Sequence, residues 1–297
     1  MKQRIITGLV FTLVIAAFIV PGYWTIWPPM VLFAAIAVIA SCELVSAMRA
    51  CGRHVMVSRV IPGSLISLLP LLLHVVLPMD DGVPSAALAL SVSLLGLFFA
   101  LAASSIGSLI AHGPAAFPDA MAGGGVALYV AFPLTCASVL FLFTGHGWHW
   151  LVIGLSAPWI SDVFAYFTGS LFGRHRIVPA LSPKKTLEGC LGGLAGGMLF
   201  QVVVFQLFRV LLGSAGVWQP AALWFALISG LVLSVASQLG DWLASGYKRY
   251  CGIKDFGAVL PGHGGLMDRF DSVFFTLPVA LVLSVLHQLM IYSGDLL

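Results

Sequence analysis

The chain has 297 residues, of which 60% are hydrophobic and only 8% are charged. Together with a mean hydropathy of +1.05, this composition excludes an ordinary soluble domain and predicts a membrane protein. The net charge is +3 and arises from residues expected at the inner membrane face. We expect these residues to contact anionic lipid headgroups or phosphates rather than nucleic acid.

Nine apolar runs along the chain are long enough to cross a bilayer, which takes about 20 residues per helix. Backbone groups in lipid have to be satisfied internally, and no alternation with a period of two is visible, so helices are expected and a β-barrel is not. The predicted fold class is an all-α polytopic integral membrane protein. The runs cover residues 5–20, 25–48, 60–78, 86–110, 122–144, 149–171, 188–212, 220–243 and 272–293.

The basic residues predict an orientation, because Lys and Arg accumulate on the cytoplasmic side of short connections. With a cytoplasmic N-terminus and an external C-terminus, all of the 14 Lys and Arg residues except Arg209 fall at the inner face. Lys2 and Arg4 precede the first run, but no small-x-small cleavage site follows it. We therefore predict a retained first helix rather than a signal peptide.

A single membrane domain is expected over residues 1–297, because no soluble domain, low-complexity tail or internal repeat is visible. Helices one to five fall in 1–145. Helices six to nine, which carry the chemistry, fall in 149–297, with inner loops at 172–187 and 244–271. The cysteines are scattered and form no C-x-x-C pair, so we interpret them as packing residues rather than as disulfides or zinc ligands.

Acidic residues inside the predicted helices indicate function, because an ionisable group in lipid is costly and usually functional. Asp162 stands near the middle of the sixth run with no charged neighbour in sequence, so it is either a helix-packing group or part of a site. Glu43 lies near an inner helix end and equally fits a pair with Arg49 or Arg53. The candidate polar residues are Glu43, Asp162, Glu188, Asp241, Asp255, Asp268 and Asp271.

The segment from Ser245 to Asp271 concentrates most of the polar chemistry of the chain. Its glycines allow positive φ and a close approach of the backbone to a ligand, and consecutive turn amides can form an anion-binding concavity. Gly262, Gly264 and Gly265 are the candidates for this role. The cations suited to a polyphosphate are Lys248, Arg249, Lys254 and Arg269, and the hard oxygen ligands suited to Mg²⁺ are Asp241, Asp268 and Asp271.

Carboxylates, cations and glycines together predict a metal-assisted phosphate site, although the chain has no G-x-x-x-x-G-K-S/T loop. From the residues alone, the leading interpretation is a membrane-embedded phosphoryl or nucleotidyl transferase. The alternative is a transporter for an anionic solute. A transporter would need charges along a path through the membrane, whereas here they gather at one face.

This segment resembles the signature of the phosphatidate cytidylyltransferase family, also called CDP-diacylglycerol synthases. It reads S-x-x-K-R-x4-K-D-x-G-x2-L-P-x-H-G-G-x2-D-R-x-D from Ser245 onward, and S-Q-L-G-D precedes it and ends at Asp241. A second block, from Ser161 to Gly189, looks like the family pattern D-x-x-A-Y-x-x-G-x-x-F-G-x-H followed by S-P-x-K-T-x-E/Q-G. The resemblance covers the C-terminal half closely, and the N-terminal half mainly by hydropathy and by Glu43.

Two positions depart from the family pattern. Val163 stands where a Ser often follows the first Asp, which puts a hydroxyl role beside Asp162 in doubt. Tyr247 replaces a residue that is usually aliphatic, and we expect this change to be tolerated because an aromatic ring can fill the same interfacial space.

The resemblance implies transfer of a cytidylyl group from CTP to phosphatidic acid, which yields CDP-diacylglycerol and pyrophosphate in phospholipid biosynthesis. It implies a requirement for Mg²⁺, with one or two metal ions. Asp241 and Asp268 are the expected metal ligands, and Asp271 is a third ligand or a group that orients Arg269. Contacts to substrate phosphates are expected from Lys248, Arg249, Lys254, Arg269 and His263, the last followed by Gly264 and Gly265; a loop hydrogen bond is the simpler role for His263.

Ser182, Lys184 and Lys185 precede the seventh predicted helix. A helix N-terminus with two lysines suits a lipid headgroup or a phosphate. An ordinary positive flank with a cap explains these residues equally well.

The site is expected at the cytoplasmic face of the cell inner membrane, in a cavity between helices six, eight and nine that opens to both lipid and cytosol. A lipid or polyprenol kinase is an alternative, and it would release a nucleoside diphosphate rather than pyrophosphate. A non-catalytic lipid binder is a further alternative. A homodimer is allowed but not required.

Overall fold

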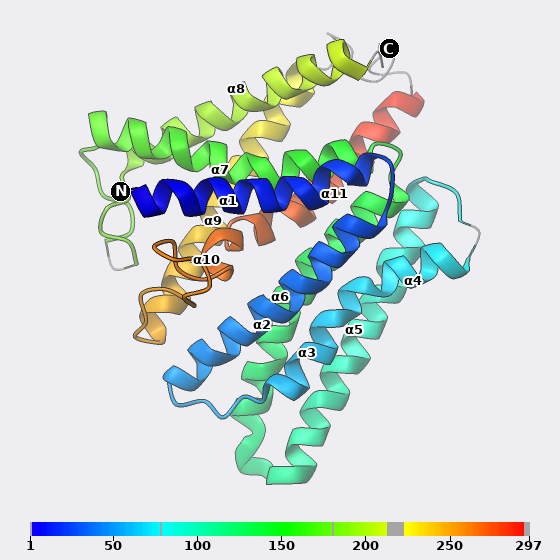
Figure 1. Ribbon diagram of the computed structural model, residues 1–297, viewed down its shortest axis with the longest axis vertical. Helices are drawn as coiled ribbons and strands as arrows, with labels where there is room; N and C mark the ends of the chain where they lie inside the picture. Colours follow the sequence, from blue (N-terminus) through cyan, green and yellow to red (C-terminus); the bar gives the residue numbers. More distant parts are fainter. Residues whose placement is uncertain (1, 78, 180, 213–222, 294–297) are drawn as a thin grey trace.

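The computed structural model describes residues 2–77, 79–179, 181–212 and 223–293. Within these ranges the chain is helical, and the only β pairing is two isolated bridges, Arg176 with Thr186 and Leu260 with Gly264. Nine helical segments of the described chain are long and apolar enough to cross a membrane. The expected all-α polytopic class is therefore confirmed, and the chain is a multi-pass membrane protein (Figure 1).

The helices follow one another in a simple order, with short connections between most of them. They are α1 (Lys2–Ile19), η1 (Val20–Tyr23), α2 (Trp27–Ala50), α3 (Val57–Leu65), η2 (Ile66–Leu68), α4 (Leu69–Val76), α5 (Val83–His112), η3 (Pro114–Ala116), α6 (Phe117–Phe143), α7 (Gly147–Phe172), α8 (Leu187–Leu212), α9 (Leu223–Tyr250), α10 (Met267–Phe270) and α11 (Val273–Ser293).

The third span is not the single helix expected over 60–78, whose last residue lies outside the described ranges. It is built from α3, η2 and α4 in series. Pro62 lies inside α3 and Pro70 in the first turn of α4. Proline lacks an N–H and clashes with the preceding turn, so a helix with two prolines is readily interrupted.

The eighth helix is longer than the run expected over 220–243. As α9 it continues to Tyr250 and carries Lys248 and Arg249 in its last turn, and positive-φ Gly252 follows it. Residues 220–222 lie outside the described ranges. The expected inner loop 244–271 is wrong at both ends, because hydropathy marks the edge of the hydrocarbon and not the end of the helix. The loop between α9 and α10 covers only 251–266.

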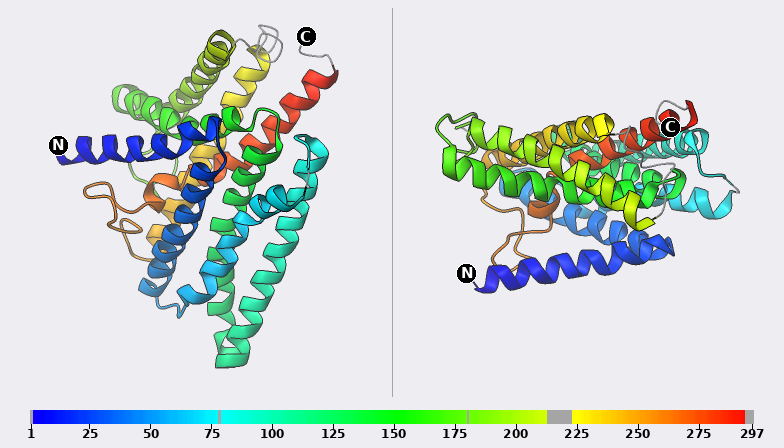
Figure 2. Two further views of the ribbon diagram at one scale, coloured as in Figure 1. Left: turned by 45° about the vertical axis from the view of Figure 1, so that its right-hand side comes forward. Right: turned by 90° about the horizontal axis from the view of Figure 1, so that it is seen from above.

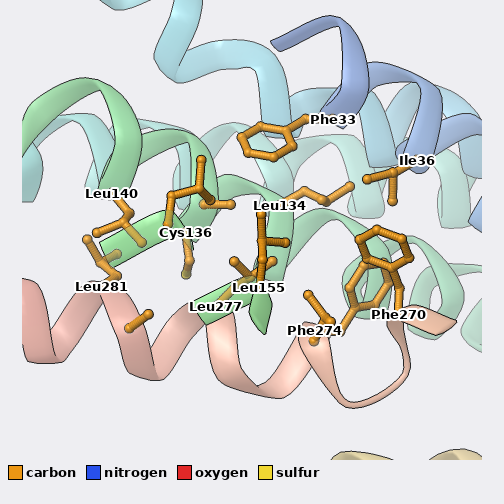
Figure 3. Packing of buried hydrophobic residues seen from close by; sticks show 14 of the residues in the cluster. Phe33, Ile36, Leu134, Cys136, Leu140, Leu155, Phe270, Phe274, Leu277 and Leu281 are labelled. Carbon is orange, nitrogen blue, oxygen red and sulfur yellow. The ribbon is translucent and has the colours of Figure 1, made fainter. Parts of the chain in front are cut away.

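The buried core lies where α6 packs against α2, α7 and α11 (Figure 3). Phe33 of α2, Leu134 of α6 and Phe274 of α11 are all at most 1% exposed. Lipid tails are as apolar as these side chains, so close van der Waals packing holds the helices together. The more polar helices α8 and α9 pack onto this core through α7 and α11.

Glycines bring α7, α8 and α9 close together. A Cβ on Gly193 of α8 would lie 3.0 Å from Ser161 Oγ of α7, and one on Gly230 of α9 would lie 2.5 Å from Gly197 O of α8. Small residues at such crossings let helix backbones approach each other. These three helices consequently pack tightly against one another, and their loop-proximal ends shape the candidate site.

The first helix lies along one edge of the molecule (Figure 2). It is tied down near both ends, because Thr7 Oγ1 donates to Pro261 O at 3.0 Å and Trp148 Nε1 donates to Ile19 O at 2.8 Å. Its loop-proximal end therefore contacts the segment that precedes α10.

The charged connections share one end of the bundle. In Figure 1 the start of α1, the connection from α7 to α8 and the loop after α9 lie on the same side, and the far end of α11 lies on the other. This grouping is what the distribution of Lys and Arg leads us to expect. The side chains of residues 2–5 lie outside the described part of the chain, and the assignment of this end to the cytoplasm stays a prediction.

Candidate functional site

A cavity of about 430 Å³ that contains charged side chains lies between α7, α8 and α9. Sequence reasoning expected a cavity between helices six, eight and nine, but the third wall is the seventh helix, α8. The close glycine packing of α7 on α8 brings the start of α8 into the site. The cavity is lined by Asp162, Ala165, Tyr166, Gly169, Ser170, Lys184, Lys185, Thr186, Gly189, Cys190, Gln238, Asp241 and Trp242.

Asp241 is the central carboxylate of this cavity. Lys185 Nζ forms an ion pair with Asp241 Oδ2, and Ser245 Oγ donates to Asp241 Oδ1 at 3.4 Å. Lys185 also lies over the Trp242 ring, 6.0 Å from its centroid. Both partners of the ion pair are partly exposed, at 22% and 28%. The pair is accessible from the cavity, so a bound anion can reach the lysine.

Asp162 lies on the α7 wall and is exposed to the cavity. It interacts electrostatically with Asp241 and Asp271, and with Lys185 and Arg269 as the nearby cations. Asp162 is therefore brought together with the residues of the two sequence blocks rather than buried as an isolated packing group. We refer to Asp162, Asp241, Asp268, Asp271, Lys185, Lys248 and Arg269 as the polar centre.

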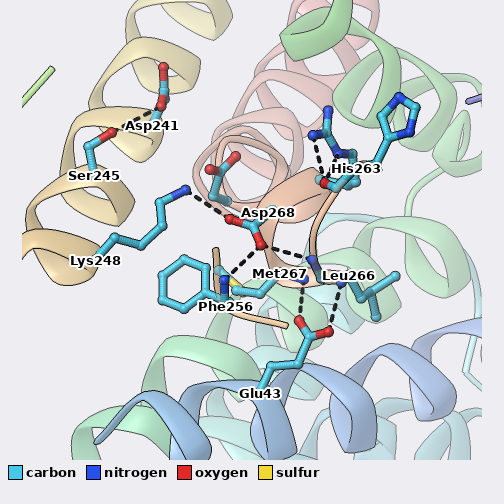
Figure 4. A network of polar contacts seen from close by, with 12 residues as sticks. Glu43, Asp241, Ser245, Lys248, Phe256, His263, Leu266, Met267 and Asp268 are labelled. Atoms are coloured by element: carbon cyan, nitrogen blue, oxygen red, sulfur yellow. Dashed lines mark hydrogen bonds and ion pairs between the residues drawn. The ribbon is translucent and has the colours of Figure 1, made fainter. Parts of the chain in front are cut away.

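Asp268 is held by the loop that precedes it (Figure 4). Its Oδ2 accepts the N–H groups of Phe256 at 2.8 Å and Gly265 at 2.9 Å, and Lys248 Nζ lies 2.9 Å from its Oδ1. The side chain of Asp268 is only 4% exposed and that of Lys248 16%. Lys248 also lies 5.2 Å from the Phe256 ring centroid. Asp268 thus ties α9, the loop and α10 together.

The glycines of the loop have two structural roles: some adopt a positive φ, and one leaves room for a neighbouring side chain. Gly262 and Gly264 adopt the expected positive φ, at 77° and 86°. Gly265 does not have a positive φ, and there the expectation is wrong. The absence of a side chain at Gly265 leaves room for Glu43, because a Cβ there would lie 2.5 Å from the carboxylate oxygens of Glu43. The amide of Gly265 points to Asp268, so it serves a carboxylate of the chain itself.

The Arg269 side chain contacts the backbone carbonyl of His263. Arg269 Nη2 donates to His263 O at 2.9 Å and its Nε does so at 3.3 Å. The His263 ring lies beside α1, where a Cβ on Gly8 would be 3.7 Å from Nε2, and it points away from Asp241 in Figure 4. Contact of His263 with a substrate phosphate stays a prediction.

Among the other predicted phosphate ligands, Lys184 alone lines the cavity, where it is exposed. Arg249 is exposed and donates from Nε to Leu181 O at 3.3 Å, and Lys254 is exposed in the loop. Ser182 belongs to the turn before α8, where its N–H donates to Val178 O at 2.9 Å.

Asp271 lies between the loop and α11. It is 9% exposed, accepts the N–H of Ser272 at 2.7 Å and interacts electrostatically with Asp241, Lys248 and Asp268. Its position fits the expectation of a group that belongs to the same site as Asp241.

Three of the candidate carboxylates lie outside this centre. Glu188 accepts the N–H groups of Arg174 at 3.0 Å and His175 at 3.2 Å, and so closes the connection between α7 and α8. Asp255 is exposed in the loop. The alternative of an ion pair between Glu43 and Arg49 or Arg53 is not realised, because the Glu43 carboxylate turns toward the loop before α10 and accepts backbone amides there.

The donors of the polar centre fit Mg²⁺, because carboxylates are the hard oxygen ligands that this ion prefers. In the part of the chain that the structure describes, no group of three His, Cys, Asp or Glu side chains is arranged to hold one metal ion. Mg²⁺ is usually held by one or two carboxylates with waters and substrate phosphates. Asp241 and Asp271 best suit that role, whereas Asp268 already accepts two amides and an ammonium group.

Sequence reasoning missed several residues of the site. Ser245 lies four residues after Asp241 on α9, a spacing that places both on one helix face and could have been noticed. Tyr166, Gln238 and Trp242 line the cavity without any charge to mark them.

The structure also accounts for one of the two departures from the family pattern. Tyr247 packs edge-on against Phe256, with ring centroids 5.4 Å apart, and its hydroxyl donates to Leu44 O at 3.3 Å. The aromatic ring thus fills the space between α9, the loop and α2, as expected. Val163 is 49% exposed and carries no polar contact.

Comparison with known proteins places most of the chain in one family. A family model described as "Cytidylyltransferase family" matches residues 2–287. A phosphatidate cytidylyltransferase of Staphylococcus saprophyticus is 39% identical over 148 residues, which are 49% of this chain and 53% of the relative. One of Staphylococcus haemolyticus is 38% identical and one of Staphylococcus aureus 37% identical, each over 139 residues, 47% of this chain and 50% of the relative. The matched segment thus spans about half the length of these relatives.

Proposed function

Since the chain belongs to the cytidylyltransferase family, we propose that it is a phosphatidate cytidylyltransferase, which makes CDP-diacylglycerol and pyrophosphate from CTP and phosphatidic acid. The observation that carries the proposal is the Lys185–Asp241 pair, which opens into a cavity at the loop-bearing end of the membrane helices. That cavity has a volume of about 430 Å³, within the usual range for small-molecule sites of about 300–1,000 Å³.

The reaction needs charge neutralisation and alignment more than a strong base. A phosphate oxygen of phosphatidic acid forms a bond to the α-phosphorus of CTP, and the bond from that phosphorus to the bridging oxygen of pyrophosphate breaks. The nucleophile is already anionic near neutral pH. The enzyme therefore has to hold two anions in line and stabilise the charge on the leaving group.

The residues of the polar centre suit these two tasks. Lys185 and Lys184 are placed to bind phosphate oxygens in the cavity, and Asp241 orients the Lys185 ammonium through their ion pair. Lys248 and Arg269 add positive charge from the side of the loop. We assign Arg249 in the last turn of α9 and Lys254 in the following loop to the first capture of a polyphosphate, because both side chains are exposed.

A bound Mg²⁺ would supply Lewis acidity that stabilises charge on the phosphates, and Asp241 with Asp271 would hold it. We infer that this end of the bundle faces the cytoplasm of the inner membrane, where CTP is available and where positive residues accumulate. The homodimer allowed by the sequence stays a prediction.

The direct test is pyrophosphate release by the detergent-purified protein given CTP, phosphatidic acid and Mg²⁺. Release that requires both substrates and stops on chelation of Mg²⁺ supports the proposal. Asp241→Asn is the inactive control. Asp119→Asn is its matched control, because Asp119 has only a 4.0 Å contact with Arg53, outside the polar centre.

The same assay separates the alternative of a lipid kinase. A kinase would release CDP or ADP and no pyrophosphate. That outcome, or no turnover by folded protein, contradicts the proposed function.

A further inference from the structure

Glu43 is a buried carboxylate that the proposed chemistry does not use. It lies on α2, in the N-terminal half of the chain, and is 6% exposed. None of the ion pairs in the described chain includes it. Its two oxygens instead accept backbone N–H groups, from Leu266 at 2.9 Å and from Met267 at 2.7 Å. A buried carboxylate without a cation needs such donors.

The two amides belong to the start of α10. Leu266 is the N-cap residue of this helix, and no side chain of its own segment caps it. A helix leaves its first amides without intrahelical partners, so Glu43 satisfies them from a helix more than 220 residues away in the sequence. The next two residues of α10 are Asp268 and Arg269, both in the polar centre.

The backbone of the loop is shaped around this carboxylate. A Cβ on Gly257 or on Gly265 would lie 2.5 Å from an oxygen of Glu43. Phe256, which precedes Gly257, and Gly265 itself donate the two amides that hold Asp268. Neighbouring backbone amides of the same segment therefore bind both carboxylates. Glu43 reaches these amides from α2, and Asp268 reaches them from α10 (Figure 4).

We propose that Glu43 is a positioning residue for the transfer reaction: it docks the loop 251–266 on α2 and thereby fixes Asp268, Lys248 and Arg269 relative to the cavity. The inference rests on the proposed function for its catalytic consequence. The docking itself rests only on the two hydrogen bonds and the two glycines. Glu43 touches no substrate in this assignment.

The first test is a substitution that keeps the size of the side chain. In Glu43→Gln one oxygen becomes an NH₂ group that faces a backbone N–H, so one of the two hydrogen bonds is lost. Loss of a group that orients catalytic residues typically lowers activity about 10- to 100-fold. We expect kcat and kcat/KM to fall together, because the aligned state is needed in the transition state.

Ser41→Ala is the matched control on the same helix. Ser41 is fully buried and donates to Ser64 Oγ at 2.8 Å, away from the loop. This change removes a buried hydrogen bond without touching the loop, so turnover per folded molecule should stay normal. If Glu43→Gln has the kcat of the wild type, calculated per folded molecule, the positioning role is overturned.

A second pair of variants tests the contact through its geometry. Gly257→Ala places a methyl group against the Glu43 carboxylate and should lower kcat in the wild-type background. In the Glu43→Ala background the space is vacated, so Gly257→Ala should cause no further loss. Non-additivity of this kind reports a direct interaction, whereas losses that multiply would contradict it.

Hydrogen exchange of the amides gives a readout that does not depend on activity. The amides of Leu266 and Met267 should exchange faster in Glu43→Gln than in the wild type, and as slowly as in the wild type in Ser41→Ala. Equal protection in all three proteins would overturn the docking. A wild-type protein without transferase activity would contradict the proposed function, while the exchange data would still decide the docking.

Discussion

The carboxylates at the loop before α10 and those in the cavity between α7, α8 and α9 differ in their partners and in their exposure. Asp268 of α10 and Glu43 of α2 each accept two backbone amides at this loop, and the Lys248 partner of Asp268 is largely buried. In the cavity, Asp241 is paired with a lysine side chain that can exchange its partner for a ligand. The first arrangement fixes geometry and the second leaves charge available for chemistry.

This contrast predicts the largest loss of activity for Asp241→Asn. The change keeps the shape of the side chain but removes the charge that orients Lys185 and that would bind a metal ion. Removal of one preorganised electrostatic group typically costs about 100- to 1,000-fold in kcat. We expect that loss with little change in thermal unfolding, because both partners of the pair are partly exposed. An equally large fall in thermal stability would show that Asp241 is structural.

Asp268→Asn should instead damage activity and stability together. The amide keeps one acceptor oxygen but leaves Lys248 without its partner in a largely buried site. Breaking a buried ion pair by removing one partner typically costs about 3–5 kcal/mol. Thermal unfolding of the detergent-solubilised protein measures this effect. The double variant Asp268→Asn with Lys248→Gln should recover part of the stability and none of the activity.

Lys185→Gln and Lys184→Gln separate two neighbouring lysines. Lys185 pairs with Asp241, while Lys184 is exposed at the rim. A hydrogen bond to a charged group is worth about 1.5–3 kcal/mol, so we expect kcat/KM to fall about 10- to 100-fold for Lys185→Gln. Lys184→Gln should have a smaller effect that weakens as salt is added. Equal effects would mean that the ion pair with Asp241 has no special role.

The smallest effect on activity is expected from joining Cys51 and Cys251. Their sulfurs lie 3.2 Å apart, where the end of α2 meets the end of α9 beside the loop. Burial raises the pKa of the Cys251 thiol to about 12. The thiolate is the reacting form, so the rate of disulfide formation with copper phenanthroline should rise with pH from neutral toward 9. Turnover should persist, because the two helix ends are already adjacent.

Cys51→Ser provides the control for this experiment. If the disulfide detected by mass spectrometry of peptides is absent in Cys51→Ser, the cross-link joins Cys51 and Cys251. A cross-link through another cysteine would place the ends of α2 and α9 differently from the arrangement described above.

Much of the architecture could be predicted from hydropathy, since all nine spans found among the described residues coincide with apolar runs. Their ends could not, because Lys248 and Arg249 continue α9 beyond the hydrocarbon boundary. The residue types of the site were visible in the motif around Asp268. Their pairings were not, because Lys185 meets Asp241 across 56 positions and Glu43 meets Leu266 across 223. Such contacts arise from helix packing, which one sequence does not encode as a local pattern.

The most direct test of the central claim follows a labelled phosphorus through the reaction. Folded protein is given phosphatidic acid, Mg²⁺ and CTP radiolabelled either at the α- or at the γ-phosphorus, and the lipid is extracted. We expect the α label to enter the lipid as CDP-diacylglycerol and the γ label to appear in the water phase as pyrophosphate, and we expect Asp241→Asn to slow both processes about 100- to 1,000-fold. Transfer of the γ label to the lipid would contradict this expectation and identify a kinase.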